Sequence, residues 1–503
     1  MTAQQDPVIT YSFAKDHGVL LVPQEAEAGK GVFLGVREGA RALAVLEARR
    51  AVGPVSGLKP LTRSEFDQLL STVYAAKGID AEYSESGLED REDLASLVEG
   101  IPQTADLLDA EDDAPIIRLI NGLIYEAVKR RASDVHIEPY EDKLSIRYRI
   151  DGVLQDVLSP SRRLAPLLVS RIKVMARLDI AEKRMPQDGR ISLALGGRAI
   201  DVRVSTLPSR YGERVVLRLL DKEQARLDLL ELGMDVSTLD TFKSILRSPN
   251  GIVLVTGPTG SGKTTTLYSG LTLLNDQSRN ILTVEDPIEY GLEGVGQTQV
   301  NTKVGLTFAA GLRAILRQDP DVVMVGEIRD IETAEIAVQA SLTGHVVLST
   351  VHTNSAIAAV TRLRDMGIEP FLLSSTLRGV LAQRLVRRLC PSCRETYTPD
   401  DFEARALGLT PSPDLVFYRA QGCLSCGNSG FSGRAGVFEL ITIDTNLRRM
   451  IHDEASEQQM ESYAFQSTQS LFQNGIRHVL NGVTTAEEVL RVCRPEGEGN
   501  ADI

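Results

Sequence analysis

The sequence lacks any long apolar run. No stretch of its 503 residues approaches the ~18 consecutive apolar residues that a membrane-spanning helix needs. The opening residues, MTAQQDPVITYSFAKDHG, also lack the basic region followed by an apolar region that marks a secretory signal peptide. These absences predict a cytoplasmic protein that touches a membrane only through partners.

An excess of basic charge is absent as well. The chain has 55 Lys or Arg against 68 Asp or Glu, a net charge of −13. Between Glu82 and Asp113 there are twelve acidic residues and one arginine, so this segment alone accounts for −11. The rest of the chain is close to neutral and has no basic domain, so we expect no nucleic-acid partner.

The acidic segment divides the chain. Its self-repelling charge predicts a solvated linker over residues 81–113. Residues 1–80 contain short apolar runs but no catalytic constellation, which indicates a small N-terminal domain. Residues 114–225 combine an amphipathic helix pattern from Pro115 with strand-like stretches such as KLSIRYRID and RAIDVRVSTL, which predict an α+β domain.

The stretch GPTGSGKT fits the phosphate-loop pattern G-x-x-x-x-G-K-S/T between a buried-strand run, IVLV, and a helical run, TTTLYSGLTLLN. Glycines let backbone N–H groups close on phosphate oxygens, while Lys263 can bridge the outer phosphates and Thr264 can ligate Mg²⁺. The predicted ATP-binding residues are Gly257, Pro258, Thr259, Gly260, Ser261, Gly262, Lys263, Thr264 and Thr265. The alternative to nucleotide binding is a glycine-rich turn that carries a surface lysine.

Three further segments each join an apolar strand to polar residues. NILTVEDPIEY contains Glu285 and Asp286, PDVVMVGEIRD contains Glu327, and GHVVLSTVHTN contains His352. In a doubly wound parallel α/β sheet the carboxyl ends of the strands share one edge, where ligands bind. The four segments therefore predict one site.

Roles follow from that arrangement. Glu327 is the candidate for the carboxylate that activates the attacking water, and Glu285 or Asp286 would assist Mg²⁺ and water positioning. The alternative for each carboxylate is a helix cap or a pair with Arg329.

Two histidines flank VVLSTV. On an extended strand His345 and His352 would lie ~23 Å apart, too far to share one metal ion. His352 is a candidate γ-phosphate sensor or coupling group, with a hydrogen-bonded core histidine as the alternative, and the role of His345 stays open.

Cysteines are few, and their spacing is informative. Four of the five form two C-x-x-C pairs, the pattern of a structural tetrahedral Zn²⁺ site. A redox dithiol would account for one pair but not for two. We therefore predict a zinc-binding subdomain over residues 388–430, with Cys493 unpaired. The predicted ligands are Cys390, Cys393, Cys423 and Cys426.

The set GPTGSGKTTTLY, ILTVEDPIEY, LRQDPDVVMVGEIRD, TGHVVLSTVHTNSA and the paired C-x-x-C motifs closely resembles the secretion ATPases of type II secretion and type IV pilus assembly. Upstream, ASDVHIEPYEDKLSIRYRIDG and RMPQDGRISL are similar to the second domain of that family. The resemblance implies a RecA-like P-loop ATPase core over residues 226–503, preceded by a PAS-like domain. It covers roughly residues 110–495, and YSFAKDHGVLLVP adds a short, weaker match to type II members.

The family's properties extend these expectations. The resemblance implies a homohexamer with nucleotide between the second domain and the core, where Arg203 and Arg218 would close on the γ-phosphate. It also implies two partners: the cytoplasmic domain of a membrane-anchored secretion protein, bound through residues 1–80, and an inner-membrane platform protein. The implied cofactors are ATP, Mg²⁺ and Zn²⁺. The resulting catalytic set is Lys263, Glu285, Glu327, His352, Arg203 and Arg218.

The favoured function is therefore an ATPase that drives pseudopilus assembly and protein export by type II secretion. A pilus-extension ATPase is the alternative within the family, and a non-hydrolysing nucleotide-binding scaffold is the alternative outside it. The complete set of Lys263, Thr264 and Glu327 argues against the scaffold. A retraction motor is disfavoured because such relatives lack the cysteine pairs.

Overall fold

A computed structural model gives the fold of two units, which meet in the sequence between Asp221 and Lys222. The acidic linker, the turn at Gly196–Gly197 and the residues after Cys493 lie outside the described part of the chain, apart from two isolated positions in the linker. The structure describes residues 17–22, 33–52, 55–62, 114–195, 198–221, 229–276 and 278–493, together with single positions at 14, 65, 66, 94 and 98.

The first unit begins with a small three-stranded sheet. Strand β2 (Phe33–Arg37) pairs antiparallel with β1 (Val19–Val22) and parallel with β3 (Gly57–Leu61). Helix α2 (Ala42–Val52) turns Ala44 and Ala48 into this core. Among the described residues, no helix is both long and apolar enough to cross a membrane.

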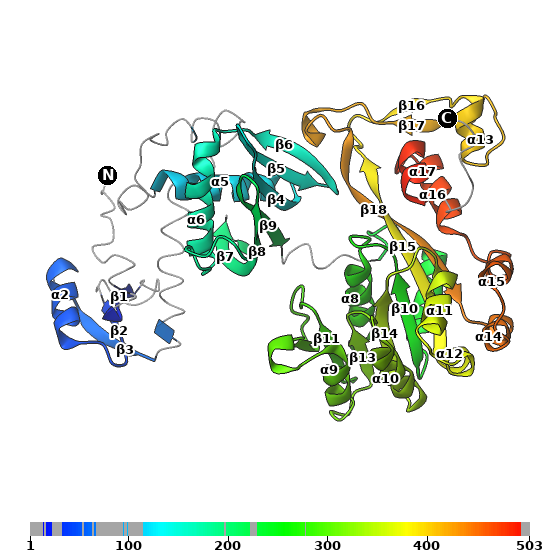
Figure 1. Ribbon diagram of the computed structural model, residues 1–503, viewed down its shortest axis with the longest axis horizontal. Coiled ribbons are helices and arrows are strands. Elements are labelled where there is room, and N and C mark those ends of the chain that lie inside the picture. Colours follow the sequence, from blue (N-terminus) through cyan, green and yellow to red (C-terminus); the bar gives the residue numbers. More distant parts are fainter. Residues whose placement is uncertain are drawn as a thin grey trace. The chain divides into compact units, whose positions relative to one another are not determined.

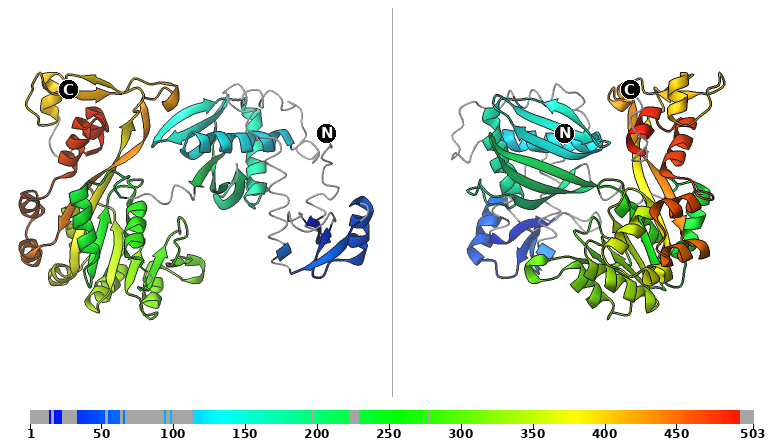
Figure 2. Two further views of the ribbon diagram at one scale, coloured as in Figure 1. Left: turned by 180° about the vertical axis from the view of Figure 1, so that it is seen from behind. Right: turned by 45° about the vertical axis from the view of Figure 1, so that its right-hand side comes forward.

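A six-stranded sheet follows in the order β6-β5-β4-β9-β8-β7. Apolar side chains from alternate strand positions bury one face against α5 (Ala114–Lys129) and α6 (Ala165–Met175), which Figure 2 shows in cyan and green against the sheet. The other face carries charged side chains. The strands are β4 (Ala132–Pro139), β5 (Leu144–Ile150), β6 (Val153–Leu158), β7 (Gln187–Leu195), β8 (Arg198–Ser209) and β9 (Gly212–Asp221), with a 3₁₀ turn at Arg162–Leu164.

The second unit is built on a seven-stranded sheet in the order β12-β11-β13-β14-β10-β15-β18 (Figure 1). Neighbouring strands of this sheet pair in parallel, except that β18 pairs antiparallel with β15. The predicted α/β core is thus confirmed, with one antiparallel edge strand that the sequence patterns did not reveal. The strands are β10 (Gly251–Thr256), β11 (Ile281–Glu285), β12 (Gly296–Gln299), β13 (Val322–Val325), β14 (Val346–Val351), β15 (Leu377–Leu389) and β18 (Phe431–Thr442).

Helices cover both faces of this sheet, as is expected when the central strands β10, β13 and β14 are buried at every position. Val253 and Val255 pack with α7 and α8, whereas Ile252 and Leu254 pack in the core formed with α9, α10, α11 and α12. The helices are α7 (Val236–Leu246), α8 (Lys263–Leu274), α9 (Phe308–Ile315), α10 (Ile331–Leu342), α11 (Ala356–Asp365) and α12 (Pro370–Thr376).

Strands β15 and β18 continue past the sheet as a two-stranded ribbon. β15 pairs with β10 only up to Ala382 but with β18 as far as Leu389. A small module at the end of the ribbon contains α13 (Asp401–Ala406) and the hairpin of β16 (Glu395–Tyr397) and β17 (Phe417–Arg419). The C-terminal helices are α14 (Thr445–His452), α15 (Glu457–Ala464), α16 (Leu471–Leu480) and α17 (Ala486–Cys493).

One buried carboxylate fastens two of these helices to the sheet. Glu439 of β18 is 3% exposed, and its two oxygens accept the backbone N–H groups of Ala356 (2.9 Å) and Leu471 (3.1 Å). These residues begin α11 and α16, so both oxygens satisfy helix N-termini. Burial raises the pKa of Glu439, and the two backbone hydrogen bonds oppose that shift.

Replacement of Glu439 by alanine should remove the acceptor of the Ala356 and Leu471 N–H groups, while the serine N-caps of both helices stay in place. At about 0.5–2 kcal/mol for each hydrogen bond lost at a helix N-terminus, Glu439→Ala should lower the free energy of unfolding by about 1–4 kcal/mol in denaturant titration. Glu335→Ala, at an exposed position of α10, should stay within about 0.5 kcal/mol of the parent. Equal stability of the two variants would show that the carboxylate does not fasten the helices.

Candidate active site

The phosphate loop connects β10, whose residues are all buried, to α8. Gly257, Gly260 and Gly262 have φ of 148°, 80° and 87°, a region that strongly favours glycine. Thr264, the second residue of α8, is exposed at the carboxyl edge of the sheet. The loop therefore presents its backbone, a helix N-terminus and an accessible hydroxyl at the same place.

Lys263 is buried against its own loop. Its Nζ donates to the carbonyl oxygens of Gly257 (2.8 Å) and Pro258 (3.0 Å). Burial lowers the pKa of Lys263 to about 8; the Glu327 carboxylate opposes this shift and the Arg384 guanidinium adds to it. The lysine of the loop and the predicted general base are thus close enough to interact electrostatically.

Glu327 follows β13 and has both oxygens engaged. Arg329 donates to Oε1, and His352 Nε2 lies 3.4 Å from Oε2. The Glu327 side chain is 14% exposed, whereas the side chains of Arg329 and His352 are at least half exposed. The sequence offered a pair between Glu327 and Arg329 as the alternative to a catalytic role. The structure contains this pair, and it also brings Glu327 into contact with His352, the predicted phosphate sensor.

Glu285 ends β11 and points into the protein. It accepts hydrogen bonds from Tyr268 Oη, from Thr283 Oγ1 (2.5 Å) and from Gln297 Nε2 (3.0 Å). At 3% exposure its carboxylate is enclosed. Burial and the bond to Glu285 raise the pKa of Tyr268 far above its usual value, so the phenol remains a donor. Glu285 therefore holds β11 to α8, and its carboxylate is not accessible to solvent.

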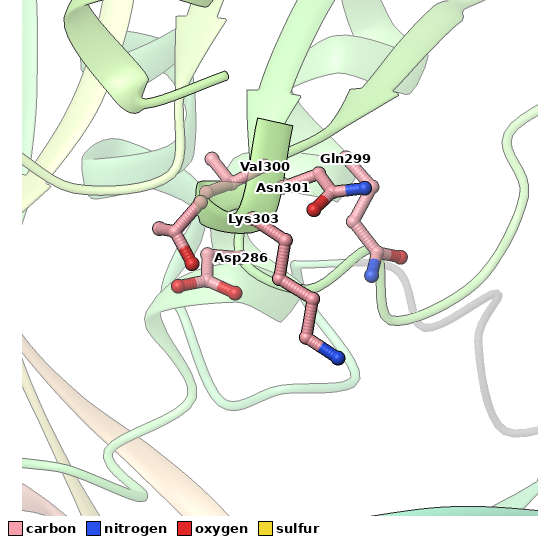
Figure 3. Close-up of a pocket in the computed structure, with 6 residues that line it drawn as sticks. Asp286, Gln299, Val300, Asn301 and Lys303 are labelled. Carbon is pink, nitrogen blue, oxygen red and sulfur yellow. The ribbon is translucent and has the colours of Figure 1, made fainter. Parts of the chain in front are cut away.

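Asp286, the next residue, is exposed and lines a pocket of about 410 Å³ (Figure 3). Adjacent strand residues point to opposite sides, which accounts for the contrast with Glu285. Gln299, Asn301 and Lys303 supply polar groups around the same opening. The sequence left the choice between Glu285 and Asp286 open, and only Asp286 offers an accessible carboxylate.

The two histidines lie on either side of β14. His352 follows the strand at the site, whereas His345 precedes it and its Nδ1 contacts the Ala340 carbonyl (2.8 Å) and Thr343 Oγ1 (3.1 Å). His345 therefore belongs to the turn after α10 and not to the site.

Arg203 and Arg218 lie in the first unit, whereas the phosphate loop lies in the second. They are register partners on β8 and β9, on the charged face of the six-stranded sheet. Arg218 Nε donates to Asp134 (2.9 Å) and its side chain is 61% exposed. Arg203 follows Val202, whose side chain is fully buried on the opposite face.

The four predicted metal ligands gather at the end of the ribbon. Their sulfur atoms all lie within 4.8 Å of one another. Sulfurs at the corners of a tetrahedron around Zn²⁺, each at about 2.3 Å from it, would lie about 3.8 Å apart. The observed separations are 3.9 Å for Cys390–Cys423, and 3.8 Å for both Cys393–Cys426 and Cys423–Cys426. The cluster therefore fits a tetrahedral metal ion, and Cys493 lies elsewhere, buried in α17.

Several residues at the site escaped the sequence patterns. Gln297 contacts Glu285 from β12 and belongs to no recognisable motif. Tyr268 contacts Glu285 from α8 and ends the segment GPTGSGKTTTLY, but the sequence analysis assigned it no role. Gln383 and Arg384, which are buried on β15, contact the loops around the site. The available signal was their polarity inside the apolar run GVLAQRLVRRL, because a polar side chain in a buried strand needs a partner.

Comparison with known proteins gives consistent matches along the chain. The model of the type II/IV secretion system protein family matches residues 109–491, and a model of an N-terminal domain of GSPII protein E matches residues 8–74. Type II secretion system protein E of Pseudomonas aeruginosa is 58% identical over 488 residues, which cover 97% of this chain and 96% of that protein. Type II secretion system ATPase E of Vibrio cholerae is 58% identical over 452 residues, 90% of each chain.

Solved structures agree with the fold. The pilus retraction motor PilT, solved with bound ADP, is 28% identical with a TM-score of 0.52 and covers 75% of this chain and 97% of its own. The Legionella pneumophila ATPase DotB, at 20% identity, has a TM-score of 0.56 over 74% of this chain and 94% of its own, which is a likeness of fold. From these matches, the chain belongs to the type II/IV secretion system protein family, in the branch that contains type II secretion system protein E.

Proposed function

We propose that this chain hydrolyses ATP at the phosphate loop and that hydrolysis drives pseudopilus assembly and protein export by type II secretion. The observation that carries the proposal is that Lys263, a phosphate-binding cation, and Glu327, a candidate general base, follow β10 and β13 at the same edge of one parallel sheet, where Thr264 is accessible. Relatives that are 58% identical over most of the chain are named for type II secretion, one of them as an ATPase.

Binding would begin at the backbone of the phosphate loop. The N–H groups at the start of α8 and the ammonium group of Lys263 would receive the phosphate oxygens, and Lys263 would exchange its contacts to Gly257 and Pro258 for them. Thr264 and Asp286 would hold Mg²⁺, directly or through water. Bound there, the ion would neutralise charge on the phosphates.

Hydrolysis would need a base for the attacking water. Glu327 can accept the proton through Oε2, while Arg329 keeps Oε1 in place. His352, whose Nε2 lies 3.4 Å from Oε2, would sense the γ-phosphate. In an assembled ring, Arg203 and Arg218 of the α+β domain (residues 114–225) would stabilise the negative charge that develops on the phosphate in the transition state.

Assembly and cofactors form the finer part of the proposal. Family membership supports a homohexamer, and the match of residues 8–74 to GSPII protein E supports docking of the N-terminal domain on the cytoplasmic part of a membrane-anchored partner. This docking, with contact to an inner-membrane platform protein, would hold the ring at the membrane. The sulfur geometry supports zinc as the metal. The same N-terminal match and the relatives' names also favour secretion over the pilus-extension alternative.

The chemistry is tested at two residues. Lys263→Ala should abolish nucleotide binding or turnover, whereas Glu327→Gln should still bind ATP but hydrolyse it at least ~100-fold more slowly, the scale expected for loss of a general base. Glu335→Gln, on the exposed face of α10, is the matched control and should retain full turnover. Near-normal hydrolysis by Glu327→Gln would place water activation on another residue.

The metal site is tested by analysis of purified protein. Replacement of Cys390, Cys393, Cys423 or Cys426 by serine should remove about one equivalent of zinc and destabilise the module, because structural zinc binding contributes folding free energy. Cys493→Ser should keep the metal. A parent protein with no zinc and four titratable thiols would contradict the site.

The arginines and the ring are tested together. Arg203→Ala and Arg218→Ala should lower turnover far more than ATP affinity, because such arginines act on transition-state charge. Arg163→Ala, at an exposed position of the same unit, should change neither. Specific activity of the parent should rise with protein concentration. Constant activity across a dilution series, with both arginine variants unaffected, would argue against the ring.

A further inference from the structure

Gln383 of β15 lies directly behind the phosphate loop. β15 runs parallel to β10, and Ala382 is the register partner of Thr256, so the next residue of each strand brings Gln383 opposite Gly257. The glutamine is 1% exposed. A polar side chain of this length, fully buried beside the loop, calls for a physical reason.

The glutamine contacts the loop at both of its ends. A β-carbon on Gly257 would lie 2.4 Å from the backbone carbonyl oxygen of residue 383, and one on Gly262 would lie 2.8 Å from the side-chain nitrogen Nε2 of Gln383. Both distances are too short for a real β-carbon. Gly257 therefore leaves room for the backbone of β15, and Gly262 leaves room for the end of the Gln383 side chain.

The side-chain amide also holds the first turn of α8. Thr266 Oγ1 donates to Gln383 Oε1 at 2.7 Å, and both side chains are buried. Thr266 lies three residues after Lys263 and two after Thr264, so this bond fixes the part of the helix that directs both. Because a hydroxyl can donate or accept, the bond persists with either orientation of the amide.

Part of the amide remains unsatisfied within the described part of the chain. Gln383 Nε2 is buried there without a hydrogen-bond partner. A leucine or methionine would fill the same space without that cost, so packing alone does not explain a glutamine. The amide nitrogen faces Gly262, at the point where the loop turns into α8.

The next residue of β15 holds the opposite side of the site. Arg384 Nη2 donates to the Asn354 carbonyl at 2.8 Å, two residues after His352. Because neighbouring strand residues point to opposite faces, one dipeptide contacts the phosphate loop and the loop after β14. The positions of both loops are therefore set from the same short piece of backbone.

We propose that Gln383 is a positioning residue for phosphate binding, which orients Lys263 and Thr264 through its bond to Thr266 and the contact of its amide nitrogen with Gly262. It touches no reacting atom. The proposal rests on nucleotide binding at this loop, as in the proposed function. Loss of the amide should therefore weaken nucleotide binding more than it slows the chemical step, because Glu327 is held by other contacts.

The test uses substitutions of similar length or shape in the full chain. Gln383→Met and Thr266→Val each remove the bond with little change in volume, and each should raise the Kd for a fluorescent ADP analogue and the KM for ATP about ten-fold. The kcat should stay within about three-fold of the parent. The double variant should match the singles, because all three lack the same bond. Gln458→Met, on an exposed position of α15, is the control and should match the parent.

Parental affinity in Gln383→Met and Thr266→Val, or a double variant whose loss is the sum of the singles, would overturn the proposal. So would a fall in kcat with unchanged KM and Kd. If Gln383→Met does not fold, Thr266→Val decides, with its thermal midpoint measured to separate a lost bond from a damaged helix. A parent that binds the ADP analogue but does not hydrolyse ATP would refute the proposed function, while the Kd comparison would still test Gln383.

Discussion

The site depends on one geometric constraint, that parallel strands end at the same edge of their sheet. β10, β14, β13 and β11 are neighbours with parallel register, so the phosphate loop, His352, Glu327 and Asp286 follow adjacent strand ends. Buried hydrogen bonds keep the edge in order; for example, Thr350 donates to the Gly326 carbonyl and holds the segment before Glu327. Groups distant in the sequence therefore meet without long loops.

This constraint is also why much of the core could be predicted from the sequence. Runs such as IVLV, VVMV and VVLSTV are apolar at nearly every position, as strands covered on both faces must be, and polar residues follow each of them. The phosphate loop has a strict pattern and the cysteine pairs have a strict spacing. The order of these motifs along the chain was therefore sufficient to assign the phosphate loop and the polar residues after the strands to one sheet edge, and the cysteines to a separate metal site.

The rest depended on contacts that no local pattern encodes. Glu285 and Asp286 are adjacent and chemically similar, yet the first is enclosed by donors 17 and 12 residues away, Tyr268 and Gln297. Likewise, Gln383 is 117 residues from Thr266. The antiparallel ribbon was not predicted either, because its outer segments, QRLVRRL and FSGRAGV, lack the regular alternation of polar and apolar residues that indicates a strand.

The position of the tetracysteine cluster at the end of the ribbon bears on the conformational entropy of the two strand ends. Beyond Ala382, β15 is paired with β18 alone, and a two-stranded ribbon is marginally stable by itself. Cys390 directly follows β15, and Cys423 and Cys426 shortly precede β18. A metal ion held by these sulfurs would act as a cross-link that closes the intervening loop and removes the freedom of the strand ends to separate. The inner end of that ribbon is the backbone of Gln383 and Arg384, so fraying at the cysteines would propagate toward the residues that set the phosphate loop.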